Sequence, residues 1–354
     1  MLDLSKIMIT PEILSLISEI DEFKGAWQLH GRMASERLKT LGVAAKIESV
    51  GASMRLDGAK LADTDVMRLL FNAELHSLTI KDQRDGFSYA RAYDGILQKH
   101  HALSFSENCL KQIYDWLMYS DTEQESLKKE KNVSNHDEVF DAPWKDLNIT
   151  FAKTKLFETT TPFEMPEKLK ELFLWTQMQL DQKTLHPLLI IGIFTALFLN
   201  MRPFQELDGC LSRVLTLFLL LKAGYIYAPY SSIERIIERN KEYYQLALER
   251  TQETLHADAP DFDIWLTFFL KVMQSQKRNL EHKILKDKNP QEHLSELDNQ
   301  IINAISEHEK LSIMKIEQIT GANRNTLKKH LAFLVEQSYI VRFGKARATW
   351  YVLS

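Results

Sequence analysis

The chain has 354 residues, and its 44 lysines and arginines against 48 aspartates and glutamates give a formal net charge of −4. Hydrophobic residues make up 45% of it, which excludes an intrinsically disordered chain and is typical of a globular protein of about two domains. Two cysteines, Cys109 and Cys210, are too few for a disulfide framework or a zinc site and favour a reducing compartment. The N-terminus lacks the order of a signal peptide, so we expect a cytoplasmic protein.

Helical spacing with little glycine or proline predicts a mainly α protein. Thr10 and Pro11 are typical of a helix start, and helical spacing then continues to about residue 45. A stretch bounded by Gly51 and Gly58 is expected to interrupt it, and Asp63 is expected to cap a helix that ends near residue 76.

Residues 119–166 are polar and weakly periodic, and we predict an extended or hairpin segment at 148–166. The apolar run 185–201 is interrupted by polar residues and a proline, which favours a buried core helix over a transmembrane segment, so no membrane partner is expected. Helices are predicted over 105–118, 167–181, 186–201, 209–223, 231–255 and 261–287.

The last part of the chain has a different pattern. Residues 286–293 are charged, contain a proline and have no apolar period, which indicates a linker. Three short helical patterns follow, and two β-rich runs close the chain, an order typical of a winged helix-turn-helix. We therefore predict an N-terminal helical region, a helical core, the linker and a winged helix, over residues 1–118, 119–285, 286–293 and 294–354.

The segment after the apolar helix is the most informative for function. A loop with Arg202, Glu206 and Asp208 leads into a second apolar helix near Gly209, and Arg213 lies one turn further on. Backbone N–H groups at a helix start form an anion or phosphate site, and a glutamate there can hold a divalent cation such as Mg²⁺ on the phosphate. The same residues also suit a solvated turn whose charges face water, and the spacing alone leaves both interpretations open.

This segment, RPFQELDGCLSR at 202–213, resembles the signature H-P-F-x-[D/E]-G-N-G-R-x-x-R of the Fic family, whose members mostly transfer AMP from ATP to protein hydroxyls. The surrounding stretches HPLLIIGIFTALFLN, LLLKAGY, KEYYQLALERTQ and DIWLTFFL resemble the family's framework as well, so the resemblance spans about residues 20–285. It implies a mainly α Fic core with a short β-hairpin flap at 148–166, which can bind a protein target by strand addition.

The departures from the signature fall on the chemistry. Arg202 occupies the position of the histidine that deprotonates the target hydroxyl, and a guanidinium has no acceptor lone pair, so it is not competent as a base. Leu207, Asp208 and Cys210 replace a glycine, an asparagine and an arginine of the phosphate cradle. We therefore expect a catalytically impaired regulatory or DNA-binding protein. The alternative is an active nucleotidyl or AMP transferase with an altered mechanism.

The resemblance implies weak binding of ATP and Mg²⁺, with Glu206 as the metal ligand. Tyr243 and Tyr244 correspond to a helix that contacts adenine, although a tyrosine pair is also typical of packing. Cys210 is interpreted as a small buried residue rather than a reactive thiolate. The implied nucleotide-binding residues are Phe204, Glu206, Asp208, Gly209, Arg213, Tyr243 and Tyr244.

Upstream, Ser53, Asp57 and Gly58 resemble the family's inhibitory motif [S/T]-x-x-x-[E/D]-G. In the family the motif's carboxylate pairs with the last arginine of the signature, which is Arg213 in this sequence. Two interpretations remain: retained autoinhibition, or an ion pair that only docks the N-terminal helix, which we favour. A homodimer is left open.

The predicted winged helix is locally basic. Between residues 324 and 347 there are six basic residues and one acid, a net charge of +5 in an acidic chain. This predicts DNA binding, with protein contact as the alternative. The expected DNA-binding residues are Arg324, Lys328, Lys329 and Lys345.

Overall fold

The computed structural model describes residues 7–29, 35–72, 81–118, 165–204, 207–255, 260–288, 295–308, 310–336, 339–343 and 349–353. The chain divides into two compact units, Met1–Leu280 and Glu281–Ser354, which are described separately. The prediction of a mainly α protein is confirmed. The predicted flap falls almost entirely on residues outside these ranges.

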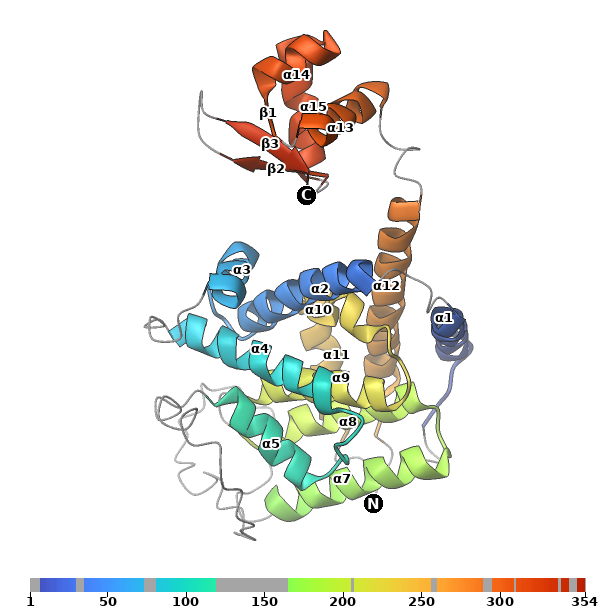
Figure 1. Cartoon of the computed structure of the whole chain (residues 1–354). Helices are drawn as coiled ribbons and strands as arrows, with labels where there is room; N and C mark the ends of the chain where they lie inside the picture. The colour runs from blue at the N-terminus through green and yellow to red at the C-terminus, as the bar shows by residue number, and fades with distance from the viewer. Residues whose placement is uncertain are drawn as a thin grey trace. The chain divides into compact units, whose positions relative to one another are not determined.

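The N-terminal unit consists of helices in the described ranges (Figure 1). They are α1 (Pro11–Leu29), α2 (Ser35–Leu56), α3 (Asp63–Asn72), α4 (Lys81–Lys99), α5 (Glu107–Leu117), α7 (Met165–Gln182), α8 (Pro187–Met201), α9 (Asp208–Lys222), α10 (Ile233–Arg239) and α11 (Lys241–Thr254), with a short 3-10 turn, η4, at Ala228–Tyr230. The last helix, α12 (Asp263–Lys288), belongs to this unit as far as Leu280.

The pair α8 and α9 forms the centre of this unit. His186 caps α8, since its Nδ1 accepts from the Leu188 N–H at 3.3 Å, and Pro187 follows at the first helical position. The rings of Phe105, Phe173 and Phe194 meet beside it, with centroids 4.5–5.7 Å apart. Both helices are buried along nearly their whole length, and none of the helices in the described ranges is long and apolar enough to cross a membrane.

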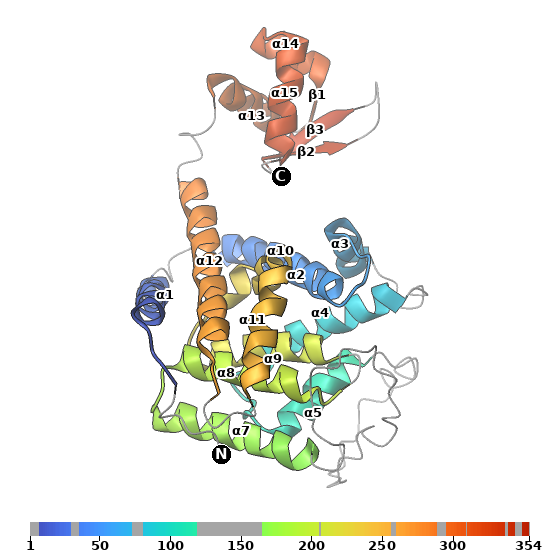
Figure 2. The same cartoon turned by 180° about the vertical axis from the view of Figure 1, so that it is seen from behind.

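Two N-terminal helices, α1 and α2, contact other elements of this unit. Both views show α1 beside α12 (Figures 1 and 2), where Glu12 pairs with Lys271 and Glu19 with Arg278. On another side, α2 packs against α10, α4 and η4. The end of α2 therefore reaches α9, and this contact builds the site described below.

Several predicted boundaries are wrong. Gly51 does not interrupt a helix but lies inside α2, which ends at Leu56 before Gly58 with φ +97°. Asp63 does not cap α3, because its carboxylate pairs with arginines, and Asp65 accepts the Ala62 N–H instead. The predicted helix 231–255 divides into α10 and α11, and α4 was not predicted at all.

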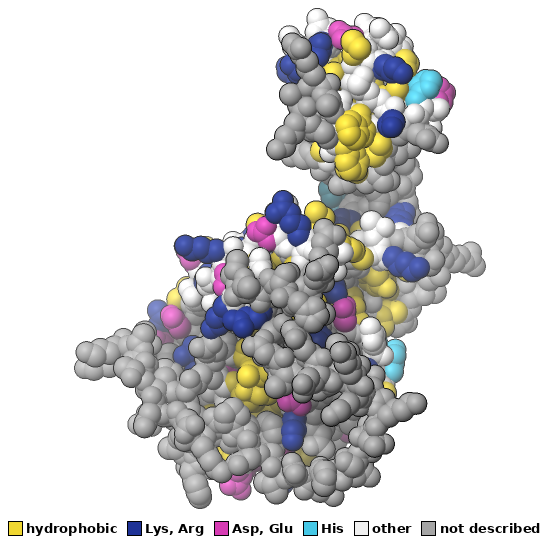
Figure 3. Space-filling view, turned by 60° about the vertical axis from the view of Figure 1, so that its left-hand side comes forward, with side chains coloured by type: hydrophobic (Ala, Val, Ile, Leu, Met, Phe, Trp, Pro, Cys, Tyr) yellow, Lys and Arg dark blue, Asp and Glu magenta, His cyan; other side chains and the backbone are white. Residues whose placement is uncertain are grey.

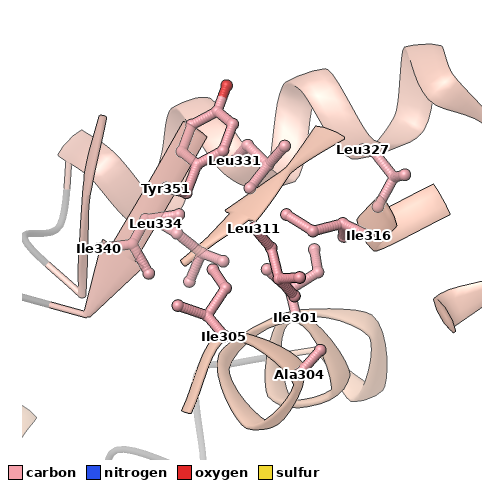
Figure 4. Close-up of a cluster of buried hydrophobic side chains, with 10 residues drawn as sticks. All are labelled: Ile301, Ala304, Ile305, Leu311, Ile316, Leu327, Leu331, Leu334, Ile340 and Tyr351. Atoms are coloured by element: carbon pink, nitrogen blue, oxygen red, sulfur yellow. The ribbon is translucent and has the colours of Figure 1, made fainter. Parts of the chain in front are cut away.

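The C-terminal unit contains α13 (Glu296–His308), β1 (Leu311–Ser312), α14 (Ile313–Thr320), α15 (Arg324–Glu336), β2 (Ile340–Phe343) and β3 (Trp350–Leu353). The strands form an antiparallel sheet in the order β1-β3-β2. One side of the sheet and the three helices enclose a small apolar core (Figure 4). The core residues are Ile301, Ala304, Ile305, Leu311, Ile316, Leu327, Leu331, Leu334, Ile340 and Tyr351.

Candidate functional site

The loop between α8 and α9 begins at Arg202, which ends α8 in the left-handed region at φ 49°. Its side chain is exposed, whereas Phe204 is buried and its ring lies against Tyr114 with centroids 4.6 Å apart. Glu206, the predicted magnesium ligand, lies outside the described residues. Within the described ranges, no group of three His, Cys, Asp or Glu side chains gathers as a metal site would require.

Asp208 closes this loop rather than opening it to an anion. Its Oδ1 accepts the Phe204 N–H at 2.8 Å, which fixes the turn into α9. Burial raises the pKa of the Asp208 carboxyl to about 7, although that hydrogen bond lowers it in part. A polyanion at this point would raise the free energy of the ionised carboxylate further.

Arg213 is buried within α9, and the end of α2 supplies its partners. Its Nε donates to Ser53 Oγ at 2.7 Å, and an Nη donates to the Ser53 carbonyl at 3.2 Å and to Asp57 Oδ2 at 2.5 Å. A guanidinium removed from water needs such partners because an unpaired buried charge is strongly unfavourable. The structure therefore brings Ser53, Asp57 and Arg213 together into one cluster.

Cys210 belongs to the same cluster. Its thiol donates to Asp57 Oδ2 at 3.1 Å, and Ser53 Oγ lies 4.0 Å from the sulfur. Burial raises the pKa of this thiol to about 12, so it stays protonated at neutral pH. Its place in the structure is that of a small buried donor.

The carboxylate of Asp57 covers the start of α9. A Cβ atom built on Gly209 would lie 2.7 Å from Asp57 Oδ1, so a side chain larger than glycine would displace the carboxylate. The N-terminus of α9, where the sequence predicted an anion site, thus already has an anion of the protein packed against it.

A ring of charges that the sequence analysis missed anchors the end of α2. Arg55 Nε pairs with Glu238 Oε1 of α10 at 2.5 Å, and its Nη1 lies 3.1 Å from Asp63 Oδ1. Arg235 of α10 pairs with both carboxylates, at 3.0 Å from Glu238 Oε2, and closes the ring. The hydrogen bond that Arg55 donates to Glu238 raises the pKa of Arg55, and the ring fixes the helix end two residues before Asp57.

The two tyrosines predicted to meet adenine lie in different surroundings. Tyr243 is 68% exposed, whereas the ring of Tyr244 packs near Trp265, with centroids 5.7 Å apart. Tyr244 also lines a cavity of about 40 Å³ beneath the cluster, together with Arg213 and Ser49. The two neighbouring tyrosines therefore differ: one is exposed, and the other lines an internal cavity.

The predicted DNA-binding residues that the structure describes all lie on α15. Arg324, Lys328 and Lys329 are exposed, whereas Leu327, Leu331 and Leu334 of the same helix belong to the core. Lys345 lies outside the described residues. Three of the four predicted cations are therefore exposed on this helix.

Solved structures match this chain, whereas no family model and no curated protein sequence does. A Fic family protein from Desulfovibrio desulfuricans G20 aligns over 98% of this chain and 97% of its own, with 17% identity and a TM-score of 0.57. A Fic domain containing signaling protein from Bacteroides thetaiotaomicron covers 75% of this chain and 95% of its own, at 18% identity and a TM-score of 0.52. Fic-1 (aa134–508) from C. elegans covers 78% and 72%, at 12% identity and a TM-score of 0.52.

These matches show that the chain has the Fic fold, as the sequence resemblance implies. At identities of 12–18% they establish the fold alone. Function has to be argued from the residues at the site.

Proposed function

We propose that this Fic-fold chain is a regulatory protein that has lost efficient AMP transfer and that binds DNA through its C-terminal unit. The first part rests mainly on Arg202. A general base must accept a proton near neutral pH, and a guanidinium, which stays protonated, has no lone pair to accept one. Arg202 is exposed at the loop where the fold's catalytic histidine is expected.

The residues at the start of α9, as they are arranged, do not fit a nucleoside triphosphate. The Asp57 carboxylate lies over Gly209, and the buried carboxyl of Asp208 stands next to it in sequence. Arg213, which would hold phosphate, already binds Ser53 and Asp57. Negative charge would have to enter beside two carboxylates, which supports a protein without nucleotide turnover.

Labelled ATP tests the loss of transfer. The purified chain is incubated with ATP labelled at the α-phosphate and Mg²⁺, alongside Arg202→His and Arg202→His/Asp57→Gly. We expect no label on the unmodified chain. Incorporation by that chain at an ordinary enzymatic rate would refute the proposal and favour a transferase with an altered mechanism.

Calorimetry with ATP separates the two roles of the Asp57–Arg213 pair. If the pair only docks α2, Asp57→Gly lowers stability and binds no ATP. If the pair still inhibits, the same variant gains ATP binding, because the carboxylate over Gly209 is removed. Glu249→Gln, which changes an exposed carboxylate on α11, is the charge-matched control.

The second part of the proposal rests on the C-terminal unit. Its element order, α13-β1-α14-α15-β2-β3 with the sheet order β1-β3-β2, supports a winged helix-turn-helix in which α15 is the recognition helix. The exposed cations of α15 suit phosphate contacts.

A gel shift with duplex DNA tests this part. Lys328→Gln/Lys329→Gln is expected to weaken binding and to reduce the salt slope by about 2, because each lysine that neutralises a phosphate contributes about 1 to that slope. Lys39→Gln/Lys60→Gln changes the net charge equally on exposed positions of the N-terminal unit and should leave binding unchanged. Equal weakening in both variants would mean that overall charge, and not α15, governs the interaction.

A further inference from the structure

The hairpin of β2 and β3 has an apolar outer face. Ile340 and Tyr351 point into the core (Figure 4), and successive residues of a strand point to opposite sides. The residues that alternate with them therefore lie on the side away from the core. The register joins them across the strands as Val341–Val352 and Phe343–Trp350, and we call these four residues the aromatic face.

The two rings of the aromatic face are open to solvent and aligned. Phe343 is 46% exposed and Trp350 is 40% exposed. Their planes lie within 15° of parallel, with centroids 6.2 Å apart. Two large, partly exposed aromatic side chains whose ring planes are nearly parallel form a surface suited to a flat, apolar or π-rich partner.

Positive charge lies close to these residues in the sequence. Lys345 follows Phe343 by two residues, and Arg347 precedes Trp350 by three. Residues 324–347 carry a net charge of +5 while the whole chain carries −4, which leaves −9 for the rest. Figure 3 shows hydrophobic side chains gathered on one side of this unit, with Lys and Arg side chains around them.

Charge and size together select the kind of partner. A second copy would bring together two segments that each carry a net charge of +5, which like charges oppose. The four side chains expose roughly 250 Å² of apolar surface, below the roughly 800 Å² per partner of a stable protein interface. Stacking of a nucleic acid base, in contrast, needs one ring face for each base and nearby cations for the backbone.

We infer that the aromatic face binds single-stranded nucleic acid, with unpaired bases stacked on Phe343 and Trp350. In a duplex the faces of the bases are covered by their neighbours, so this surface discriminates in favour of unpaired strands. The inference rests on the proposed nucleic-acid binding of the C-terminal unit and names a second class of ligand for it, beside the duplex that α15 is proposed to contact.

The test uses the full chain and three fluorescein-labelled probes of about 12 nucleotides, within the usual site size for single strands. The probes are a single-stranded oligothymidine, an abasic strand of the same length and charge, and a duplex. Fluorescence anisotropy is expected to show the oligothymidine bound about tenfold more tightly than the abasic strand, because only the former can stack.

Two variants carry the test. Phe343→Thr/Trp350→Thr should abolish the difference between the oligothymidine and the abasic strand while leaving duplex binding unchanged. Phe343→Tyr/Trp350→Tyr, which keeps the rings, should restore it. Met314→Gln, which removes an exposed apolar side chain from α14, is the matched control and should have no effect.

The outcomes are distinguishable. Equal affinity for the oligothymidine and the abasic strand, or an unchanged difference in the threonine variant, overturns the inference and leaves the proposed duplex binding intact. A concentration-dependent dimer that the threonine variant abolishes also overturns it, in favour of a second copy. Failure of the unmodified chain to bind any of the three probes overturns both the inference and the proposed nucleic-acid binding.

Discussion

The contact between α2 and α9 can be tested by its free energy, through the pair Asp57–Arg213. Arg213 is 9% exposed and Asp57 33% exposed, with 2.5 Å between Nη2 and Oδ2. Removal of one partner of a fully buried pair costs about 3–5 kcal/mol, whereas an exposed pair contributes about 0–1 kcal/mol. Since Asp57 is one-third exposed, we expect Asp57→Asn to lower the free energy of unfolding by about 2 kcal/mol, a fall in melting temperature of roughly 4–8 °C.

The assay is a double-mutant cycle with Asp57→Asn, Arg213→Gln and the double variant, measured by urea unfolding. The double variant should be less destabilised than the sum of the single ones, with a coupling energy of about 1–2 kcal/mol. Because Arg213 is buried, 0.5 M salt should change the coupling little. A coupling below about 0.5 kcal/mol would refute the reasoning that this pair docks α2 onto α9.

Three further predictions concern stability. Gly25→Ala in α1 should raise the free energy of unfolding by about 1 kcal/mol, because the space around the new Cβ is open. Gly51→Ala should not raise it, since its Cβ would lie 2.5 Å from Asp63 Oδ1. Equal unfolding midpoints for the two variants would contradict this. For Asp208, a folded pKa of about 7, raised by burial above the usual 3.8, means that stability falls as pH rises from about 4 to 7. Asp208→Asn should therefore raise the melting temperature more at pH 8 than at pH 5. The same change in melting temperature at both pH values would count against this reasoning. In the C-terminal unit Asp298 is 3% exposed, and its hydrogen bonds together outweigh the effect of burial and lower its pKa. Its contribution to the stability of the fold is therefore present above the usual pKa of 3.8 and lost in acid. Asp298→Ala should lower the melting temperature at pH 7, monitored by near-UV circular dichroism.

Much of the helical core could be predicted because its signals are local. The apolar blocks of α8 and α9 begin and end within a residue or two of the predicted bounds, since a proline opens one and Gly224, at φ +86°, follows the other. The helix α4 was missed for a physical reason. Its buried side combines Tyr89, Tyr93 and Ile96 with small residues such as Gly86 and Ala92, and the rest of the helix is polar, so its apolar stripe is weak in the sequence.

Gly51 is a position at which local sequence signals gave the wrong prediction. A glycine in the sequence suggested a break in the helix, but its role is tertiary: the missing Cβ leaves room for the Asp63 carboxylate and the Arg55 guanidinium. The partner that completes this ring, Glu238, is 183 residues away from Arg55 in the chain, and no periodicity or spacing links the two. By contrast, Asp57 and Arg213 could be paired in advance because each lies in a motif of its own.

The charge balance of the cluster around Arg213 explains how its residues satisfy one another. One cation, Arg213, faces one carboxylate, Asp57, and the other members, Ser53 and the Cys210 thiol, are neutral donors or acceptors. A buried site of this composition is satisfied without a ligand, since its charges sum to zero and its polar groups bind each other. A second arginine at position 210 would leave an excess cation that an incoming phosphate could neutralise, whereas a thiol leaves none. The thiol at position 210 therefore favours the closed arrangement, in which Asp57 and Arg213 hold α2 against α9.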